Sequence, residues 1–241
     1  MWMDFFSLNL RDWISWNHHS RADRNKVVFE NLKSSIDELY FTIFNYSRDV
    51  SDSSNELKIS LGSASTVTRL VGWQTPSLGT MKCNVDGSVQ GNSSRAACGG
   101  VVRDGVGNAI LSFSRNLGCC TITWAELHGI MDGLELLWSR GVRTVEIETD
   151  SATATTLIYD NSNGSHPCTQ LINRIKLLLS RPWNVSIKHV YRECNKVADF
   201  MAKFGQELSH GLHVFEHVPE GCLDLLEQDG LGVVFPRVVA G

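Results

Sequence analysis

The chain has 241 residues, of which 42% are hydrophobic, so it can bury a substantial core in one large domain or in a domain with an appendage. Its formal net charge of -4 excludes a polycation of the histone type but leaves room for local basic surfaces. Seven scattered cysteines without a C-x-x-C pair indicate free thiols in a reducing compartment, which predicts an intracellular protein, nuclear or cytoplasmic. No stretch approaches about 18 apolar residues, and the N-terminus lacks a basic region, so neither a membrane span nor a signal peptide is expected.

The first 79 residues divide into two parts by composition. Residues 1–47 place apolar side chains at helical spacing and predict a helical N-terminal extension. Residues 48–79 are rich in serine and show little periodicity, which is typical of a linker. Within this linker, Trp73 and Pro76 are expected to mark where the chain meets the next domain.

Residues 80–208 alternate between strand and helix patterns. Strands are predicted at 81–88, 95–103, 108–116, 143–149 and 184–191, and helices at 124–139, 151–160, 168–180 and 195–208. Three antiparallel strands followed by alternating helices and strands predict an α/β domain with a mixed five-stranded sheet flanked by helices. The tail, 209–241, gives weaker signals, and its "GLGVVFPRVV" predicts a turn and a short extended piece.

Two acids stand at the ends of predicted strands. Asp86 ends the strand in "NVDGS", and Asp150 ends the strand in "ETDS". Asp-Gly is a common way to leave a strand, and Ser151 can cap the helix that follows Asp150. Turn and cap chemistry therefore explain each acid taken alone.

Two further acids stand near the starts of predicted helices. Glu126 in "WAEL" fits a capping box with Thr123, yet it also aligns with Ile130 on the apolar stripe that should face the sheet. Asp199 in "NKVAD" follows a plausible cap, Asn195, and would favour the positive end of its helix. Four carboxylates gathered at one end of a sheet would repel one another and call for hard cations such as Mg²⁺ or Mn²⁺.

The succession "NVDGS", "WAEL", "ETDS", "NKVAD" resembles type 1 ribonuclease H, and specifically the ribonuclease H-like domains related to plant non-LTR retroelements. The resemblance covers residues 80–208 and implies a ribonuclease H-like fold. It implies a Mg²⁺-dependent endonuclease that hydrolyses the RNA strand of RNA–DNA hybrids. By this resemblance, two Mg²⁺ ions, with Mn²⁺ as a substitute, would be held by the catalytic acids Asp86, Glu126, Asp150 and Asp199.

The resemblance also implies how the nucleic acid is bound. Asn92 matches a contact to the RNA strand and Thr121 a phosphate contact to the DNA strand, while Gly87, Ser88 and Arg192 complete the expected substrate-binding set. Glycines at 87, 99 and 100 either let a nucleic acid backbone approach or serve hairpin and bulge geometry. The expected partner is an RNA–DNA hybrid, read with little sequence preference by a monomeric protein.

The chain departs from the family pattern at two places. His189 falls within the last predicted strand, so Arg192 takes the loop position where many members have a histidine. The interval between Asp150 and Asp199 is also too short for the basic handle of some members. These departures predict slow turnover or weak hybrid binding. They leave open a catalytically weak or inactive retroelement-derived binding module, or a decaying retroelement fragment.

Overall fold

A computed structural model of the chain describes residues 66–91, 95–160 and 166–240. These residues fall within one compact unit, Ser65–Gly241. The predicted helical extension at 1–47 lies outside the described residues, as do most of the predicted linker and Asn92.

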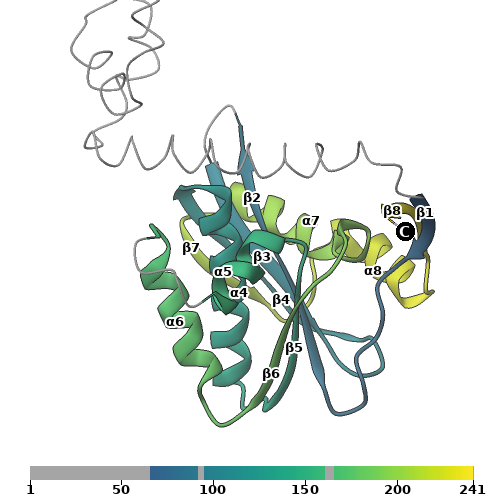
Figure 1. Ribbon diagram of the computed structural model, residues 1–241, viewed down its shortest axis with the longest axis horizontal. Helices are drawn as coiled ribbons and strands as arrows, with labels where there is room; N and C mark the ends of the chain where they lie inside the picture. The colour runs from purple at the N-terminus through teal and green to yellow at the C-terminus, as the bar shows by residue number, and fades with distance from the viewer. Residues whose placement is uncertain (1–65, 92–94, 161–165, 241) are drawn as a thin grey trace, which may run out of the picture. The chain divides into compact units, whose positions relative to one another are not determined.

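A mixed six-stranded sheet forms the centre of the unit (Figure 1). Its strand order is β6-β5-β2-β3-β4-β7. Strands β2, β3, β4 and β7 pair antiparallel, each with the next in this order. Strand β5 pairs in parallel with β2 on one side and with β6 on the other. The strands are β2 (Met81–Gln90), β3 (Arg95–Arg103), β4 (Ala109–Cys119), β5 (Thr144–Thr149), β6 (Asn184–His189) and β7 (Gly211–Phe215). The predicted α/β sheet is confirmed, and its predicted count of five strands is corrected to six because β7, from the tail, pairs with β4.

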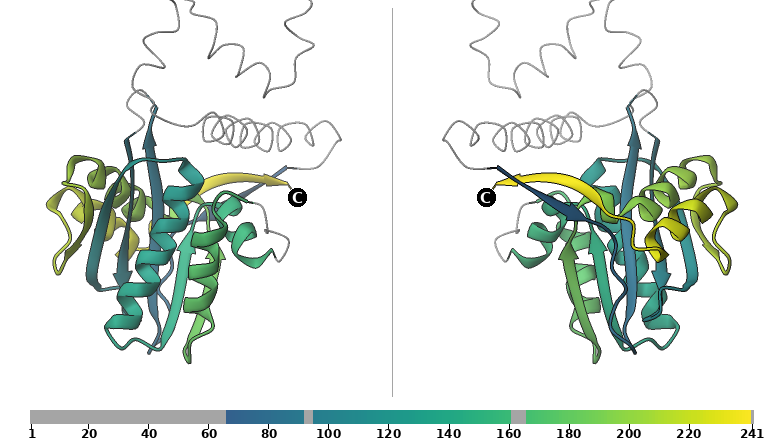
Figure 2. Two further views of the ribbon diagram at one scale, coloured as in Figure 1. Left: turned by 90° about the vertical axis from the view of Figure 1, so that its left-hand side faces the viewer. Right: turned by 90° about the vertical axis from the view of Figure 1, so that its right-hand side faces the viewer.

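Helices cover both faces of this sheet (Figure 2). Helices α4 (Ile122–Ser139), α5 (Ala152–Tyr159) and α6 (Thr169–Leu179) pack on one face around the larger apolar core. Helix α7 (Lys196–Phe204) packs on the other face with α8 (Leu223–Gly230) beside it, around a smaller core that includes Val101 and Met201. Among the described helices, none is long and apolar enough to span a membrane.

The regular elements fall close to their predicted positions. The alternation in β2 and the apolar stripe of α4 predicted the bounds of these two elements to within two residues. The last predicted helix, 195–208, is shorter in the structure, because α7 ends at Phe204 and a 3₁₀ turn, Gly205–Glu207, follows. Two further 3₁₀ turns, Arg192–Cys194 and Glu220–Cys222, precede α7 and α8.

A separate two-stranded ribbon joins the beginning and the end of the described chain. Strand β1 (Thr66–Val71) pairs antiparallel with β8 (Phe235–Ala240). Trp73, just after β1, is only 5% exposed, and its Nε1 donates a hydrogen bond to Asn84 Oδ1 at 2.9 Å. The described part of the predicted serine-rich linker therefore contains a strand, whose backbone pairs with the tail, and Trp73, which is buried against the sheet, whereas Leu70 and Leu78 are exposed.

Candidate active site

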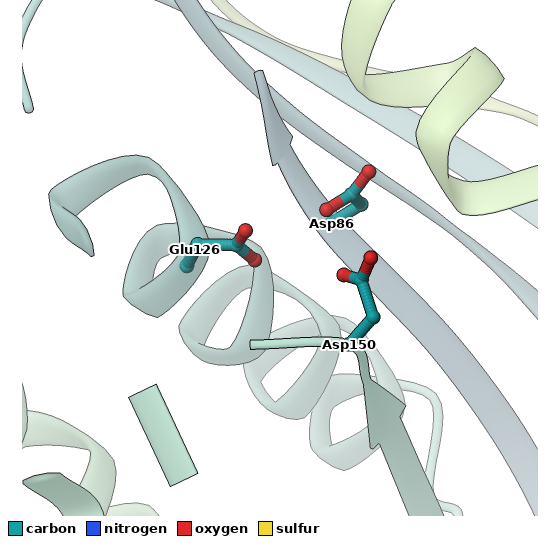
Figure 3. A group of neighbouring side chains, drawn as sticks. All are labelled: Asp86, Glu126 and Asp150. Carbon is teal, nitrogen blue, oxygen red and sulfur yellow. The ribbon is translucent and has the colours of Figure 1, made fainter. Parts of the chain in front are cut away.

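Three of the four predicted acids meet where the parallel pairing of β2 with β5 stops (Figure 3). Strand β2 itself continues to Gln90, so the prediction that Asp86 ends a strand is wrong. Val85 of β2 lies beside Thr149 of β5, so the next residues, Asp86 and Asp150, are neighbours. Glu126 reaches the same place from the second turn of α4. Ligand oxygens of these three side chains lie within 4.8 Å of one another.

Glu126 is not a capping residue. Helix α4 begins after Thr121, whose Oγ1 accepts a hydrogen bond from Trp124 N at 3.3 Å, so the capping box predicted at Thr123 is wrong. Glu126 lies beyond the N3 position from which a capping acid acts. It is 7% exposed, on the buried side of the helix with Ile130. The structure therefore supports the alternative prediction, in which Glu126 lies on the apolar stripe of α4 that faces the sheet.

Gly87 links two of the carboxylates through its backbone. Its N–H donates to Asp86 Oδ1 at 2.9 Å and to Glu126 Oε2 at 3.1 Å. A Cβ at this position would lie 2.5 Å from the backbone nitrogen of Glu126, and one at Gly99 would lie 2.4 Å from the backbone of Met201. Close packing of helices on the sheet thus accounts for both missing side chains, and a role for Gly87 in substrate binding stays a prediction.

The carboxylates of the site repel one another in a buried setting. Burial, followed by the charges of Asp150 and Asp199, raises the pKa of Asp86 to about 8, against a hydrogen bond from Gly87. Burial and the charges of Asp86 and Asp150 raise the pKa of Glu126 well above its usual value. In the described part of the chain, neither Asp86 nor Glu126 has a Lys or Arg partner.

The donor chemistry of this group fits a divalent metal ion. Its three carboxylates offer hard oxygen ligands, and burial together with neighbouring acids raises the pKa of both Asp86 and Glu126, which have no basic partner among the described residues. A bound Mg²⁺ or Mn²⁺ would supply that charge. Asp86, Glu126 and Asp150 are therefore the residues best placed to hold such an ion.

Asp199 lies near these three acids but outside their group. It stands in the first turn of α7, where its charge still raises the pKa of Asp86. Its side chain is 48% exposed, and its Oδ2 is paired with Lys203 Nζ at 2.6 Å, one turn along the helix. The structure thus brings together three of the four predicted ligands and leaves the fourth paired at the rim.

The predicted substrate-binding residues occupy several surroundings. Ser88 Oγ accepts a hydrogen bond from Gln206 Nε2 at 2.8 Å, and the hydroxyl of Thr121 caps α4. Arg192 Nε lies 3.2 Å from Asp150 Oδ2, although its side chain is 89% exposed. His189 ends β6 as predicted. The binding roles of these residues stay predictions.

Asn195 has a role that the sequence interpretation missed. Its side chain makes no cap hydrogen bond, contrary to prediction. Instead, its Nδ2 donates to Val85 O at 2.9 Å, and its Oδ1 accepts from Asn84 Nδ2 at 3.2 Å. A signal existed in β2, where Lys82, Asn84 and Asp86 recur at every second position and form a polar row on one face.

The chain is similar to known proteins along most of its described length. It matches the model of the family described as "Reverse transcriptase-like" over residues 84–205. It is 40% identical over 173 residues to an Arabidopsis thaliana protein named "Putative ribonuclease H protein At1g65750", in an alignment that covers 72% of this chain and 28% of that protein. The chain thus spans less than a third of the length of this relative.

Two solved structures are also similar to part of the chain. The ribonuclease H1 of the archaeon Halobacterium salinarum is 25% identical with a TM-score of 0.48, covering 53% of this chain and 98% of that one. LC11-RNase H1, from a compost metagenome and solved with an RNA/DNA hybrid, is 25% identical with a TM-score of 0.48, covering 53% and 96%. Because the family match takes in half of its residues, the chain belongs to the reverse transcriptase-like family of ribonuclease H-like domains.

Proposed function

We propose that this chain is a Mg²⁺-dependent endonuclease that hydrolyses the RNA strand of RNA–DNA hybrids. The observation that carries the proposal is the group of three carboxylates, Asp86, Glu126 and Asp150, two of which are buried without a basic partner among the described residues. The name of the Arabidopsis thaliana relative supports the activity, and the family match supports the fold that delivers it.

The side chains of the site divide the work of holding metal and substrate. Asp86, Glu126 and Asp150 would hold one Mg²⁺ or Mn²⁺ ion, and Asp199, freed from Lys203, would complete a second position. Two such ions, when bound, supply the positive charge that stabilises the attacking and leaving oxygens of phosphoryl transfer. The N–H of Gly87 holds the carboxylates of Asp86 and Glu126 in place beforehand.

Three features of the rim suit a polyanionic substrate. Thr121 stands at the N-terminus of α4, where free backbone N–H groups and the helix dipole favour a phosphate. The guanidinium of Arg192 is exposed next to Asp150 and can meet a second phosphate. Ser88 follows Asp86 two positions along β2, and by the family resemblance Ser88 and Asn92 would contact the RNA strand, whose 2′-hydroxyls distinguish it from DNA.

A second candidate function is a retroelement-derived module that binds nucleic acid with weak or no catalysis. Two of the proposed metal ligands carry a basic partner, Asp150 with Arg192 and Asp199 with Lys203. These ion pairs compete with metal ions for the same oxygens. This observation favours the second candidate, and a cleavage assay separates the two.

The setting of this activity is also part of the proposal. We expect an intracellular compartment, because all seven cysteines are free thiols. We also expect a monomer. The nucleic acid would be bound through its backbone and shape, with little preference for sequence.

The experiment that tests the proposal incubates the full chain with labelled RNA–DNA hybrid, single-stranded RNA and double-stranded DNA. The RNA of the hybrid should be cut in Mg²⁺ or Mn²⁺, the other substrates should survive, and EDTA should abolish cleavage. Asp86→Asn, purified in parallel, controls for contaminating nuclease. Hybrid that is bound but uncut would favour the second candidate, and equal cutting of single-stranded RNA would contradict the assignment to hybrids.

A further inference from the structure

The segment that joins β6 to α7, residues 190–195, lies against the candidate site and is here called the connecting segment. It starts from the sheet with Val190 N, which donates to Thr149 O at 2.8 Å, next to Asp150. It carries Arg192 beside Asp150 and leads into the helix of Asp199. Any shift of this segment would therefore move two groups of the site relative to the strand ends.

One side chain near the end of the chain holds both neighbours of Arg192. Arg237 Nη1 donates to Glu193 at 3.1 Å from Oε1 and 2.9 Å from Oε2. The same guanidinium lies 4.2 Å from the ring centroid of Tyr191, in a cation–π contact. Because Tyr191 and Glu193 flank Arg192, Arg237 fixes the part of the segment from which Arg192 extends.

Strand β8 supports this contact along one face. Phe235 and Arg237 are two positions apart in β8, so their side chains point the same way. Lys196 Nζ, directly after the connecting segment, lies 3.2 Å from the ring centroid of Phe235. The pairing of β8 with β1, with Val71 opposite Phe235, holds the strand along an edge. The part of the tail that contacts the connecting segment is thus a strand held by its pairing with β1.

The end of the connecting segment is fixed from beneath by a separate network. Asn195 donates to Val85 O, next to Asp86, and accepts from Asn84. Asn84 Oδ1 in turn accepts from Arg103 Nη2 at 2.7 Å, and Arg103 Nη1 is paired with Asp229 of α8 at 2.6 Å. This buried network fixes Asn195, and the bond from Val190 N to Thr149 O fixes the start of the segment. Between these two points, the side chains of Tyr191 and Glu193 are held by the contacts from β8.

We propose that Arg237 is a positioning residue for the cleavage, acting through Tyr191 and Glu193 on Arg192 and on the approach to Asp199. This inference rests on the proposed function, since it concerns the same site. Among the described residues, the side-chain contacts of Arg237 are with Glu193 and Tyr191 and include none of the four predicted ligands. Its effect is to hold the connecting segment at one distance from the strand ends, because misplacing a catalytic group by about 1 Å can cost about 100-fold in rate.

A matched control is available in the same chain. Arg140 Nη2 pairs with Glu216 Oε1 at 2.8 Å, an exposed Arg–Glu pair that involves no residue of the site. Partly exposed pairs of this kind contribute little to overall stability. Arg140→Ala and Arg237→Ala should therefore shift the melting temperature of the full chain by similarly small amounts, so that any difference between them reports on the connecting segment.

The first measurement is hydrogen–deuterium exchange of the full chain, which needs no activity. Amides of residues 190–194 should exchange several-fold faster in Arg237→Ala than in wild type, while Arg140→Ala leaves them unchanged. Unchanged exchange in Arg237→Ala would overturn the proposal. Because this measurement is independent of cleavage, a wild type that cuts no hybrid would contradict the proposed function without deciding whether β8 holds the segment.

The second measurement is the steady-state cleavage of a labelled RNA–DNA hybrid. Arg237→Ala should lower kcat by about 10-fold with a KM close to that of wild type, because positioning is lost and binding is kept. Glu193→Ala should lower kcat as well, and the double variant should lose no more than Arg237→Ala alone. A loss confined to KM would mean that Arg237 contacts the nucleic acid directly, and multiplied losses would mean that it acts apart from Glu193. Either result would overturn the proposal.

Discussion

Two groups of acidic side chains lie along the central sheet, and they are compensated in opposite ways. Glu146 and Glu148 of β5 both pair with Lys82 of β2, at 2.8 and 2.6 Å, and Glu146 also pairs with Lys188. At the end of the same two strands, Asp86 has carboxylates for neighbours instead. Within a few residues along β2 and β5, some acids thus have lysine partners, whereas Asp86 has none among the described residues.

The pKa values show what this difference means. Partial burial would raise the pKa of Glu146, yet hydrogen bonds from Lys188 and Lys82 lower it to about 2. Burial and neighbouring acids raise the pKa of Asp86 to about 8. Burial raises the pKa of Glu148 as well, against the hydrogen bond and charge of Lys82. A buried acid that only served the fold would be expected to have a partner, as Glu148 has in Lys82. Among the described residues, Asp86 and Glu126 have no such basic partner, which is what a site for a cation would require.

The sharpest way to break this comparison is Asp86→Asn. If the unpaired group holds the metal ions, cleavage should fall by at least about 1000-fold, equivalent to about 4 kcal/mol, since the charge stabilisation of the ions is lost. The melting temperature should hold or rise, because a repulsive charge has been removed. Hybrid cleavage assays and thermal melts check both effects. Cleavage near the wild-type rate in a folded Asp86→Asn protein would contradict the metal site.

Lys82→Met removes a basic partner from Glu146 and Glu148, so that Glu148 comes to resemble Asp86. The side chain of Lys82 is 4% exposed and pairs with both Glu146 and Glu148. Its loss leaves the buried Glu148 without a basic partner among the described residues, while Glu146 keeps Lys188. We expect the free energy of unfolding to fall by about 3 kcal/mol. Urea titration measures this, with Arg140→Ala as a surface control. Cleavage per folded molecule should change little, and a large catalytic loss without destabilisation would mean that Lys82 acts on the site.

Glu126→Gln and Glu146→Gln form a matched pair that keeps side-chain length and burial. Removing the unpaired charge at Glu126 should reduce cleavage by about 100-fold and leave stability equal or higher. Removing the paired charge at Glu146 should spare cleavage and lower stability by about 0.5–1 kcal/mol. Thermal melts in EDTA measure the stability of both variants, and assays in Mg²⁺ measure their cleavage of the hybrid. Equal stability changes in both variants would contradict this comparison.

The last prediction concerns the pH dependence of the metal-free protein. The pKa of Asp86 is raised to about 8 in the folded chain, from an ordinary value near 4, so the folded state binds the extra proton between these limits. The free energy of unfolding should therefore fall as pH rises from 5 to 8, by at most about 1.4 kcal/mol per unit for this group. Denaturant titrations in EDTA should show this slope, and Asp86→Asn should reduce it. An identical slope in Asp86→Asn would contradict the assignment.

Local pattern was enough to predict most of the sheet, whereas the acids of the site were assigned through the resemblance of four motifs in order. Alternation placed Asp86 in β2 and Asp150 directly after β5, although Asp86 lies within its strand, and the apolar stripe of α4 placed Glu126 on the inward side. Asn195 is the N-cap residue of α7, as predicted, but its side-chain partners, Asn84 and Val85, lie more than 100 residues earlier in the chain and were missed.

The sixth strand and the pairing at Asp199 escaped prediction for the same kind of reason. Strand β7 is short and partly exposed, and only its contact with β4 makes it a strand. The pair between Asp199 and Lys203 is a helical i, i+4 contact that the sequence permits but does not require. Local pattern indicates which residues turn inward, whereas distant partners decide what those residues meet.

The register between β2 and β5 has a consequence for how such a chain can change in length. Val85 lies beside Thr149, and Asp86 and Asp150 follow them directly. One residue inserted within β5 would turn Asp150 to the opposite face of the sheet and carry its carboxylate away from Asp86. A lengthened β5 is therefore expected to lose the site, because the number of residues in the strand sets the direction of the Asp150 side chain.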